Sequence, residues 1–63
     1  MYIVKVRAHM SNGTFVDKVY AAWCNWEEDA EDSAVSRAHK DFPLARSFSI
    51  LFCDTLENYK KVI

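Results

Sequence analysis

Two cysteines and two histidines are the side chains of this 63-residue sequence that could bind a metal or act as nucleophile and base. Zinc sites take ligands from closely spaced pairs such as Cys-x-x-Cys, and Cys24, Cys53, His9 and His39 form no such pair. Cys24 precedes a predicted helix, where a thiol can be activated, but the carboxylates that follow it oppose formation of the thiolate. We therefore expect structural thiols, no metal and no cofactor.

The sequence also lacks the other groups that catalysis would require. His39 lies near the far end of the predicted helix, more than about 20 Å from Cys24 by helical rise. Gly13 is the only glycine, so the sequence has no glycine-rich loop to hold nucleotide phosphates. Because no nucleophile, base and pocket can be assembled from these residues, the sequence predicts a protein that is not an enzyme.

The densest charge in the sequence is acidic and directly follows a tryptophan. Five of the six residues from 27 to 32 are acidic. Since the net charge of the whole chain is −1, the residues outside these five carboxylates together carry +4. Negative charge is favoured at the start of a helix, so one interpretation is that these carboxylates only stabilise the helix start and are solvated. The other is a recognition patch for a basic surface, which at the extreme mimics nucleic-acid phosphate. The predicted partner-binding residues are Trp26, Glu27, Glu28, Asp29, Glu31 and Asp32.

A second set of side chains suggests an alternative function. Basic residues and a tyrosine are expected to share the sheet face opposite the helix, which is how some small α+β modules bind single strands by stacking. The residues of this alternative nucleic-acid face are Lys5, Arg7, Lys18 and Tyr20. Binding to nucleic acid is therefore the alternative to binding a protein.

Two alternating segments joined by an Asn-Gly pair predict a β-hairpin. Tyr2 to Met10 and Phe15 to Trp23 alternate, and Asn12-Gly13 favours a tight type I′ turn. This turn pairs Met10 with Phe15, Val6 with Val19, Val4 with Ala21 and Tyr2 with Trp23 on the core face. It also sets Arg7 opposite Lys18, and since like charges repel, a bulge or a longer loop is expected to shift the register.

A helix and a third strand follow the hairpin. Asn25 is predicted to cap the helix, with Glu28 completing a capping box, and Phe42-Pro43 to end it. Small residues recur every four positions and let the helix lie close to a sheet; they are Ala30, Ala34 and Ala38, followed by Phe42. Arg46 to Cys53 reads as a strand with Phe48, Ile50 and Phe52 on one face.

Residues 1–63 are therefore expected to form a single α+β domain. Its core is a three-stranded antiparallel sheet in ββαβ order with one helix packed on one face. The tail from Asp54 is open to two interpretations. A short helix is favoured by the spacing of Asp54 and Glu57 and by a shared face of Leu56, Tyr59 and Ile63, while Lys60 to Ile63 could instead pair as an edge strand.

Length, composition and the first residues indicate the compartment. No apolar run approaches the roughly 20 residues that span a bilayer, and the start Met1-Tyr2-Ile3-Val4-Lys5 does not have the pattern of a signal peptide. A cytoplasmic location with no membrane partner is expected. This location favours two reduced thiols, and a single disulfide between Cys24 and Cys53 is the alternative.

This order of elements resembles small phage-encoded host-takeover proteins, among them inhibitors of bacterial RNA polymerase. The resemblance spans Tyr2 to Phe52 and is one of layout, not of a residue motif. It implies stoichiometric binding that blocks a bacterial protein, either RNA polymerase or a defence complex. Such polymerase inhibitors use arginines, whereas the densest charge here is acidic, so their contact residues are not carried over. The predicted function is non-enzymatic inhibition through the acidic helix.

Overall fold

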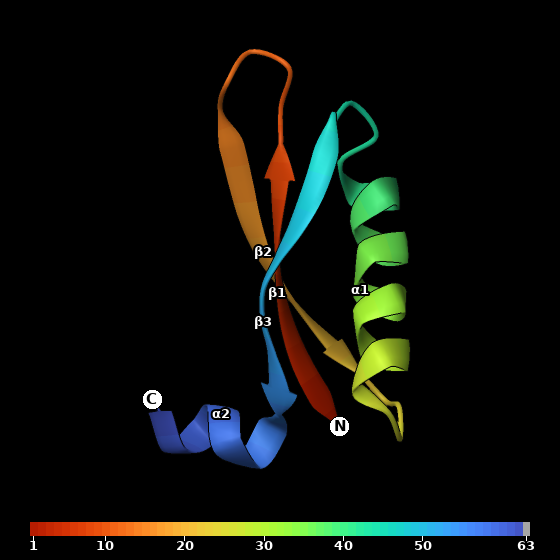
Figure 1. Ribbon diagram of the computed structural model, residues 1–63, viewed down its shortest axis with the longest axis vertical. Helices are drawn as coiled ribbons and strands as arrows, with labels where there is room; N and C mark the ends of the chain where they lie inside the picture. Colours follow the sequence, from red (N-terminus) through yellow and green to blue (C-terminus); the bar gives the residue numbers. More distant parts are fainter. Residues whose placement is uncertain (63) are drawn as a thin grey trace.

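The structure, a computed structural model, describes residues 1–62 and has the predicted α+β architecture (Figure 1). Its elements in chain order are β1 (Tyr2–His9), β2 (Phe15–Ala22), α1 (Glu27–Asp41), β3 (Ser47–Thr55) and α2 (Leu56–Val62). The strands form one antiparallel sheet in the order β2-β1-β3, and α1 packs on one face of it. Within the described residues, no helix is long and apolar enough to cross a membrane.

The core lies between the central strand β1 and the alanine stripe of α1. Val4 and Val6 are the largest fully buried side chains, and Ala30, Ala34 and Ala38 are completely buried against the sheet. Because these side chains are small, the helix axis can approach the sheet closely, and the two layers pack tightly against each other. The alternation predicted for β1 and the helix stripe are both confirmed.

The hairpin loop is one residue longer than the tight turn, which confirms the longer loop expected from the clash of Arg7 with Lys18, and the register of the tight turn is wrong by one residue. Met10 N–H donates to Thr14 O at 2.8 Å, which leaves the three residues 11–13 as the loop. A type I′ turn needs positive φ at both central residues, but only Gly13 has it, with φ of +87°. This pattern fits a type I turn with a glycine bulge, and the Asn12 carboxamide oxygen accepts a hydrogen bond from Thr14 N–H.

A shift of one residue exchanges the two faces of β2. Arg7 now lies opposite Asp17 instead of Lys18, which replaces a predicted repulsion by an attraction. Tyr20 moves into the core and is 3% exposed. Trp23, predicted to pair with Tyr2 on the core face, lies beyond the end of β2 and is 84% exposed.

β3 carries a bulge that the sequence pattern did not indicate. The pairing shifts between Lys5, which is opposite Phe52, and Val6, which is opposite Ile50. Leu51 is the extra residue, so Ile50 keeps the side of Val6 while Phe52 turns to the other face. The predicted shared face of Phe48, Ile50 and Phe52 is therefore wrong for Phe52.

Both helix starts differ in detail from the predicted caps. The N-cap residue of α1 is Trp26 and makes no side-chain capping bond, so the predicted Asn25 cap is wrong. The tail is a helix rather than a strand, but Thr55 replaces the predicted capping box, because its Oγ1 accepts the N–H of Asn58. Asp54 Oδ1 accepts from the Asn58 side chain. The predicted contribution of Ile63 to this helix lies outside the described residues.

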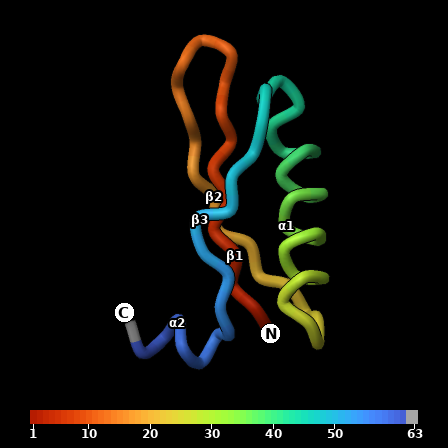
Figure 2. Tube along the Cα trace, in the orientation of Figure 1, coloured from red at the N-terminus to blue at the C-terminus, as the bar shows by residue number. Residues whose placement is uncertain are grey.

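The two ends of the sheet differ in what lies beside them (Figure 2). The hairpin loop and the connection from α1 to β3 lie at one end, while the first residue and the start of α2 meet at the other. Leu56 N–H donates to Met1 O at 3.0 Å and joins these segments. We call the sheet face away from α1 the open face; α2 lies at one end of it.

Candidate functional site

The predicted acidic patch lies at the start of α1, next to two exposed tryptophans. The connection from β2 to α1 carries both indoles outward, with Trp23 84% and Trp26 71% exposed. We call this group the tryptophan–acid corner: Trp23, Trp26, Glu27, Glu28, Asp29, Glu31 and Asp32. All of its acidic side chains reach the surface, and only Glu31 is partly buried.

A shallow hollow is the concave feature of this corner. It has a volume of about 490 Å³ and is lined by Trp26, Glu27, Glu28 and Glu31. Its lining therefore combines one tryptophan with three glutamates. An indole face and carboxylates both attract cations, the indole through its quadrupole.

No salt bridge among the described residues joins a carboxylate of the corner to a cation. Among the described residues the two salt bridges are Arg7–Asp17 and Lys18–Asp41, and neither involves the corner. The first turn of α1 contains Glu27, Glu28 and Asp29, where the helix dipole favours negative charge. The helix dipole explains why several acidic residues are tolerated together at this position. Their carboxylate oxygens remain accessible to a partner.

The opposite end of α1 is tied to β2 by side chains. Asp41 Oδ2 accepts hydrogen bonds from Tyr20 Oη at 2.7 Å and from Lys18 Nζ at 2.8 Å. The Arg37 guanidinium lies 5.1 Å from the centroid of the Tyr20 ring. Arg37 also donates to the Ala21 carbonyl oxygen at 2.6 Å. These contacts clamp the last turns of the helix onto the edge strand.

The charges of this clamp hold its groups in fixed protonation states. Burial, with the neighbouring Asp41 carboxylate, raises the pKa of Tyr20 to about 12. Hydrogen bonds from Lys18 and Tyr20 lower the pKa of Asp41 from its usual value. The phenol is protonated and the carboxylate ionised at neutral pH, which is the combination that the hydrogen bond needs.

The structure divides the residues of the predicted nucleic-acid face. Lys5 and Arg7 lie on the open face, but Lys18 and Tyr20 lie on the side of α1, where they bind Asp41. A buried Tyr20 ring cannot stack on a base. The expectation that these four side chains share one face is wrong, because the one-residue shift in register reversed β2.

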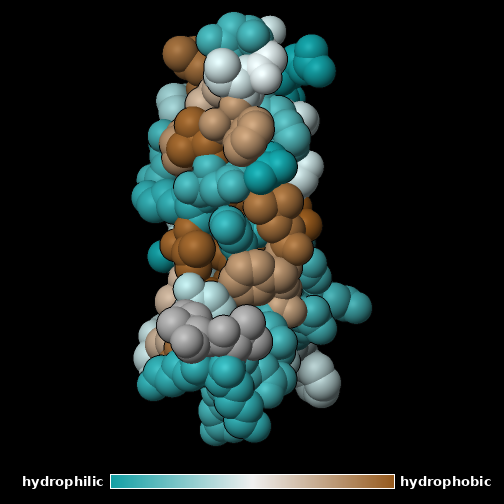
Figure 3. All heavy atoms as spheres, turned by 90° about the vertical axis from the view of Figure 1, so that its left-hand side faces the viewer, coloured by the Kyte–Doolittle hydropathy of each residue, from teal (hydrophilic) through white to brown (hydrophobic). Residues whose placement is uncertain are grey.

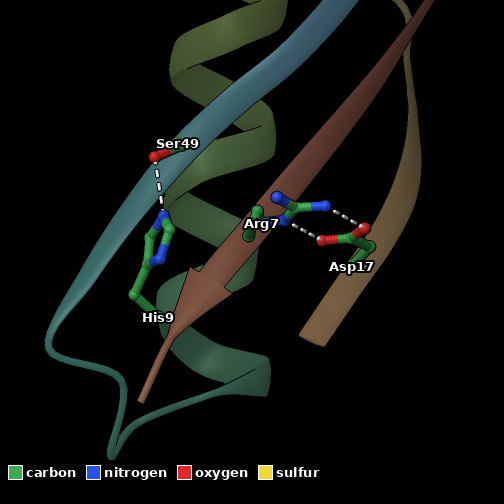
Figure 4. A network of polar contacts seen from close by, with 4 residues as sticks. All are labelled: Arg7, His9, Asp17 and Ser49. Carbon is green, nitrogen blue, oxygen red and sulfur yellow. Dashed lines mark hydrogen bonds and ion pairs between the residues drawn. The ribbon is translucent and has the colours of Figure 1, made fainter. Parts of the chain in front are cut away.

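Polar contacts tie the three strands together across the open face (Figure 4). Arg7 donates from Nε and Nη2 to the two carboxylate oxygens of Asp17 at 2.8 and 3.0 Å. This pairing lowers the pKa of Asp17 from its usual value. His9 Nε2 and Ser49 Oγ share a hydrogen bond of 2.8 Å between β1 and β3. The Arg7 guanidinium also lies 4.0 Å from the centroid of the Phe15 ring.

The two cysteines are free and partly buried, and both pack against the core. Burial, strengthened by the carboxylates of Glu27 and Glu31, raises the pKa of Cys53 to about 11. The Cys53 thiol therefore stays protonated and is a poor nucleophile. Among the residues that the structure describes, no three Asp, Glu, His or Cys side chains form a group that could hold a metal ion.

A second hollow was not foreseen from the sequence. It has a volume of about 470 Å³ and lies where the first residues, the segment before α1 and the start of α2 meet. Its lining residues are Met1, Tyr2, Cys24, Asn25, Thr55, Leu56 and Glu57. Three segments distant in sequence form it, so no local pattern could have indicated it.

Comparison with protein-family models, with curated proteins and with solved structures finds no match to this chain.

Proposed function

We propose that this chain is a non-enzymatic protein-binding domain that uses the tryptophan–acid corner to bind and block a basic surface of a bacterial protein. The observation that carries the proposal is the exposure of Trp23 and Trp26 beside carboxylates that have no cationic partner among the described residues. Large exposed aromatic side chains with adjacent charge are typical of the anchors of protein interfaces.

The two kinds of side chain have different tasks in such an interface. The indole of Trp26 supplies apolar area and loses water when a partner covers it, which contributes to affinity. The carboxylates of Glu28 and Glu31, in the hollow beside that indole, attract Lys and Arg side chains. Charge complementarity then sets the orientation of the partner and accelerates association.

The class of partner comes from the resemblance in layout to phage host-takeover proteins. The ββαβ order on which that resemblance depends is the order of the elements in the structure. RNA polymerase or a defence complex in the bacterial cytoplasm is therefore the proposed target, bound stoichiometrically. The acidic corner is compatible with a target surface that normally binds nucleic-acid phosphate, because such surfaces are basic.

The test compares the tagged wild-type domain with a charge-reversed variant, Glu27→Lys, Glu28→Lys and Glu31→Lys, in a pull-down from nuclease-treated bacterial lysate. The proteins captured by the wild type are identified, purified and titrated against both forms. We expect a one-to-one complex with the wild type and at least a tenfold weaker complex with the variant, since each reversal replaces attraction by repulsion.

Matched controls separate the corner from general surface effects. Glu57→Lys reverses an exposed charge on α2, and Leu44→Ala truncates an apolar side chain that is more exposed than Trp26. Both controls should retain the affinity of the wild type, while Trp26→Ala should weaken it. Equal affinity of wild type and charge-reversed variant would contradict the proposal. Capture that disappears on nuclease treatment would instead favour nucleic-acid binding.

A further inference from the structure

The outer edge of β2 carries backbone groups that point away from the sheet. Hydrogen bonds in an antiparallel pair alternate along each strand, so every second residue of β2 bonds to β1. Met10 N–H bonds to Thr14 O, which sets this alternation and makes the even-numbered residues of β2 the ones that bond to β1. The residues whose N–H and C=O groups point outward are therefore Phe15, Asp17, Val19 and Ala21. This direction agrees with the contact of Arg37, which donates to the Ala21 carbonyl oxygen from α1.

Residues 15–19 are the part of this edge that stays free. Arg37 Nη1 occupies the carbonyl oxygen of Ala21 at 2.6 Å, which closes the edge at its far end. Among the hydrogen bonds of residues 1–62, none reaches an outward backbone group of Phe15, Asp17 or Val19. Such a row of free donors and acceptors matches the backbone of one more extended strand. We call residues 15–19 the β2 edge.

The other outer strand of the sheet is less suited to pairing. β3 is interrupted by the bulge at Leu51, where the register shifts by one residue. A bulge breaks the regular spacing of the backbone groups and is one of the features that protect sheet edges. The pairing of β2 with β1 runs from Phe15 to Ala22 without a shift. The regular edge of the sheet is therefore that of β2.

The charged side chains of the β2 edge do not protect it. A lysine or another charge on an outer strand normally discourages further pairing. Here Lys18 Nζ donates to Asp41 at 2.8 Å, on the side of α1. On the open face, Asp17 accepts two hydrogen bonds from Arg7. Both charges are held by contacts within the chain, so neither extends over the edge.

Apolar side chains are exposed on both sides of the β2 edge. Phe15 and Val19 lie on the open face and are 54% and 44% exposed, while Val16 lies on the side of α1 and is 41% exposed. Figure 3 views the open face, on which apolar and polar side chains alternate, and a layer over this face would leave Val16 uncovered. A neighbouring strand contributes side chains to both faces of a sheet and would cover all three residues. Similar exposure on the two faces thus points to the edge rather than to one face.

A second copy of β2 does not fit the β2 edge. An antiparallel two-fold pairing that uses all of residues 15–19 places Asp17 directly opposite the Asp17 of the other copy. A shift towards Ala21 places Lys18 opposite Lys18, and a shift towards the hairpin loop leaves only three paired residues of β2. Like charges directly opposite each other destabilise a strand pair. The strand that this edge accepts therefore has a different sequence.

We infer that the β2 edge binds an extended segment of another protein, which adds a fourth strand to the sheet. Such a segment carries apolar side chains opposite Phe15, Val16 and Val19 and no acidic side chain opposite Asp17. Backbone hydrogen bonds supply its affinity, and these side chains supply its selectivity. The tryptophan–acid corner begins beyond the other end of β2, so the inference does not depend on the function proposed for that corner.

The test selects peptides from a displayed library of random seven-residue sequences, with the wild-type chain as bait. Apolar residues should alternate in the enriched peptides, because an extended segment turns every second side chain to the same face. Each enriched peptide is then synthesised with N-methyl groups on one alternate set of its amides or on the other. Methylating the set that faces β2 should weaken binding at least about tenfold, while methylating the other set should leave the affinity unchanged. Equal effects of the two sets, or no enriched peptide, would overturn the inference.

Two substitutions of one residue provide a matched pair in the protein. Val19→Pro removes the outward N–H without breaking a hydrogen bond to β1, whereas Val19→Thr keeps that donor. Far-UV circular dichroism verifies that each variant keeps its helices and strands. Val19→Pro should bind the enriched peptides at least about tenfold more weakly than the wild type, and Val19→Thr should bind them equally well. Equal binding to Val19→Pro and the wild type would place the peptides on another surface, such as the tryptophan–acid corner, and contradict the inference.

Hydrogen exchange of the wild type covers the case in which Val19→Pro does not fold. The amides of Phe15, Asp17 and Val19 face water in the free chain and should exchange faster than those of Val16 and Lys18, which bond to β1. An enriched peptide should slow exchange at the first three amides alone. Unchanged exchange would contradict the inference. Protection that appears when the chain alone is concentrated would also contradict it, because it would assign the edge to a second copy.

Discussion

The two ends of helix α1 use charge in opposite ways. At the end of the helix, Asp41 is bonded to Lys18 and Tyr20, and Arg37 lies over the same tyrosine ring. At its start, five carboxylates follow Trp26 in the sequence, and none takes part in a salt bridge among the described residues. The charged groups at the end of α1 stabilise the fold, whereas the carboxylates at its start form no salt bridge among the described residues.

This difference separates residues that stabilise from residues that are free to bind. A polar group that is satisfied inside the chain gains little from a partner, because binding would have to break an existing contact. The exposed indole of Trp26 and the carboxylates that follow it make no salt bridge among the described residues, so a partner can bind them without breaking one. The comparison therefore assigns stability to the clamp around Asp41, and it supports the proposal that the tryptophan–acid corner binds a partner.

The largest difference between the two ends is expected when the aromatic residue at each end is truncated. Tyr20→Ala removes a buried ring and should lower the free energy of unfolding by about 3–5 kcal/mol. Trp26→Ala removes an exposed ring and should change it by less than about 0.5 kcal/mol. Urea unfolding followed by circular dichroism measures both. Similar losses in the two variants would remove the distinction between the ends.

An intermediate effect is expected at alkaline pH. The raised pKa of Tyr20, about 12 against an ordinary value of 10.0, means that the folded state favours the protonated phenol. Its contribution to stability, on the order of 2 kcal/mol, is complete below pH 10 and is lost as the pH rises from about 10 to 12. Tyr20→Phe should not show this loss. Unfolding curves recorded across that interval for both proteins test the expectation, and identical pH profiles would argue against it.

The smallest effect is a change in one ionisation. Lys18→Ala removes the first hydrogen-bond donor of Asp41, so the pKa of Asp41 should rise. It should still stay below its usual value, because Tyr20 continues to donate. Lys40→Ala is the control, since Lys40 precedes Asp41 in the chain but is not among its hydrogen-bond donors. Carboxyl carbon chemical shifts measured during a pH titration report the change, and equal shifts in both variants would contradict the assigned role of Lys18.

Local patterns predicted the elements well. The alternation of β1, the alanines of α1 and the stop at Phe42-Pro43 each depend on neighbours within a few residues, and the structure confirms them. The acidic run is equally clear in the sequence, because five of the six residues from 27 to 32 are acidic. The exposure of Trp23 was not, since a two-residue turn would have placed it opposite Tyr2.

Register was the point that sequence reasoning left open, because the clash of Arg7 with Lys18 indicated a shift but not its size. Asn12-Gly13 suits both a two-residue and a three-residue loop, and the choice depends on pairs formed by the whole hairpin. The observed register gives Arg7 an acidic partner in Asp17 and brings Tyr20 within reach of Asp41. In β3 the spacing of Phe48, Ile50 and Phe52 favoured regular alternation, although a bulge turns Phe52 towards Tyr59.

The sequence by itself determined the fold class, the order of the elements and the acidic character of one helix end, because all three follow from spacing and composition along the chain. Only the tertiary structure decided which side chains share a face. The choice of face in a strand reverses with a shift of one residue, and that shift is set by contacts between segments far apart in sequence. For this reason the predicted basic sheet face separated into two parts, while Trp26 and the acidic residues that follow it stayed together.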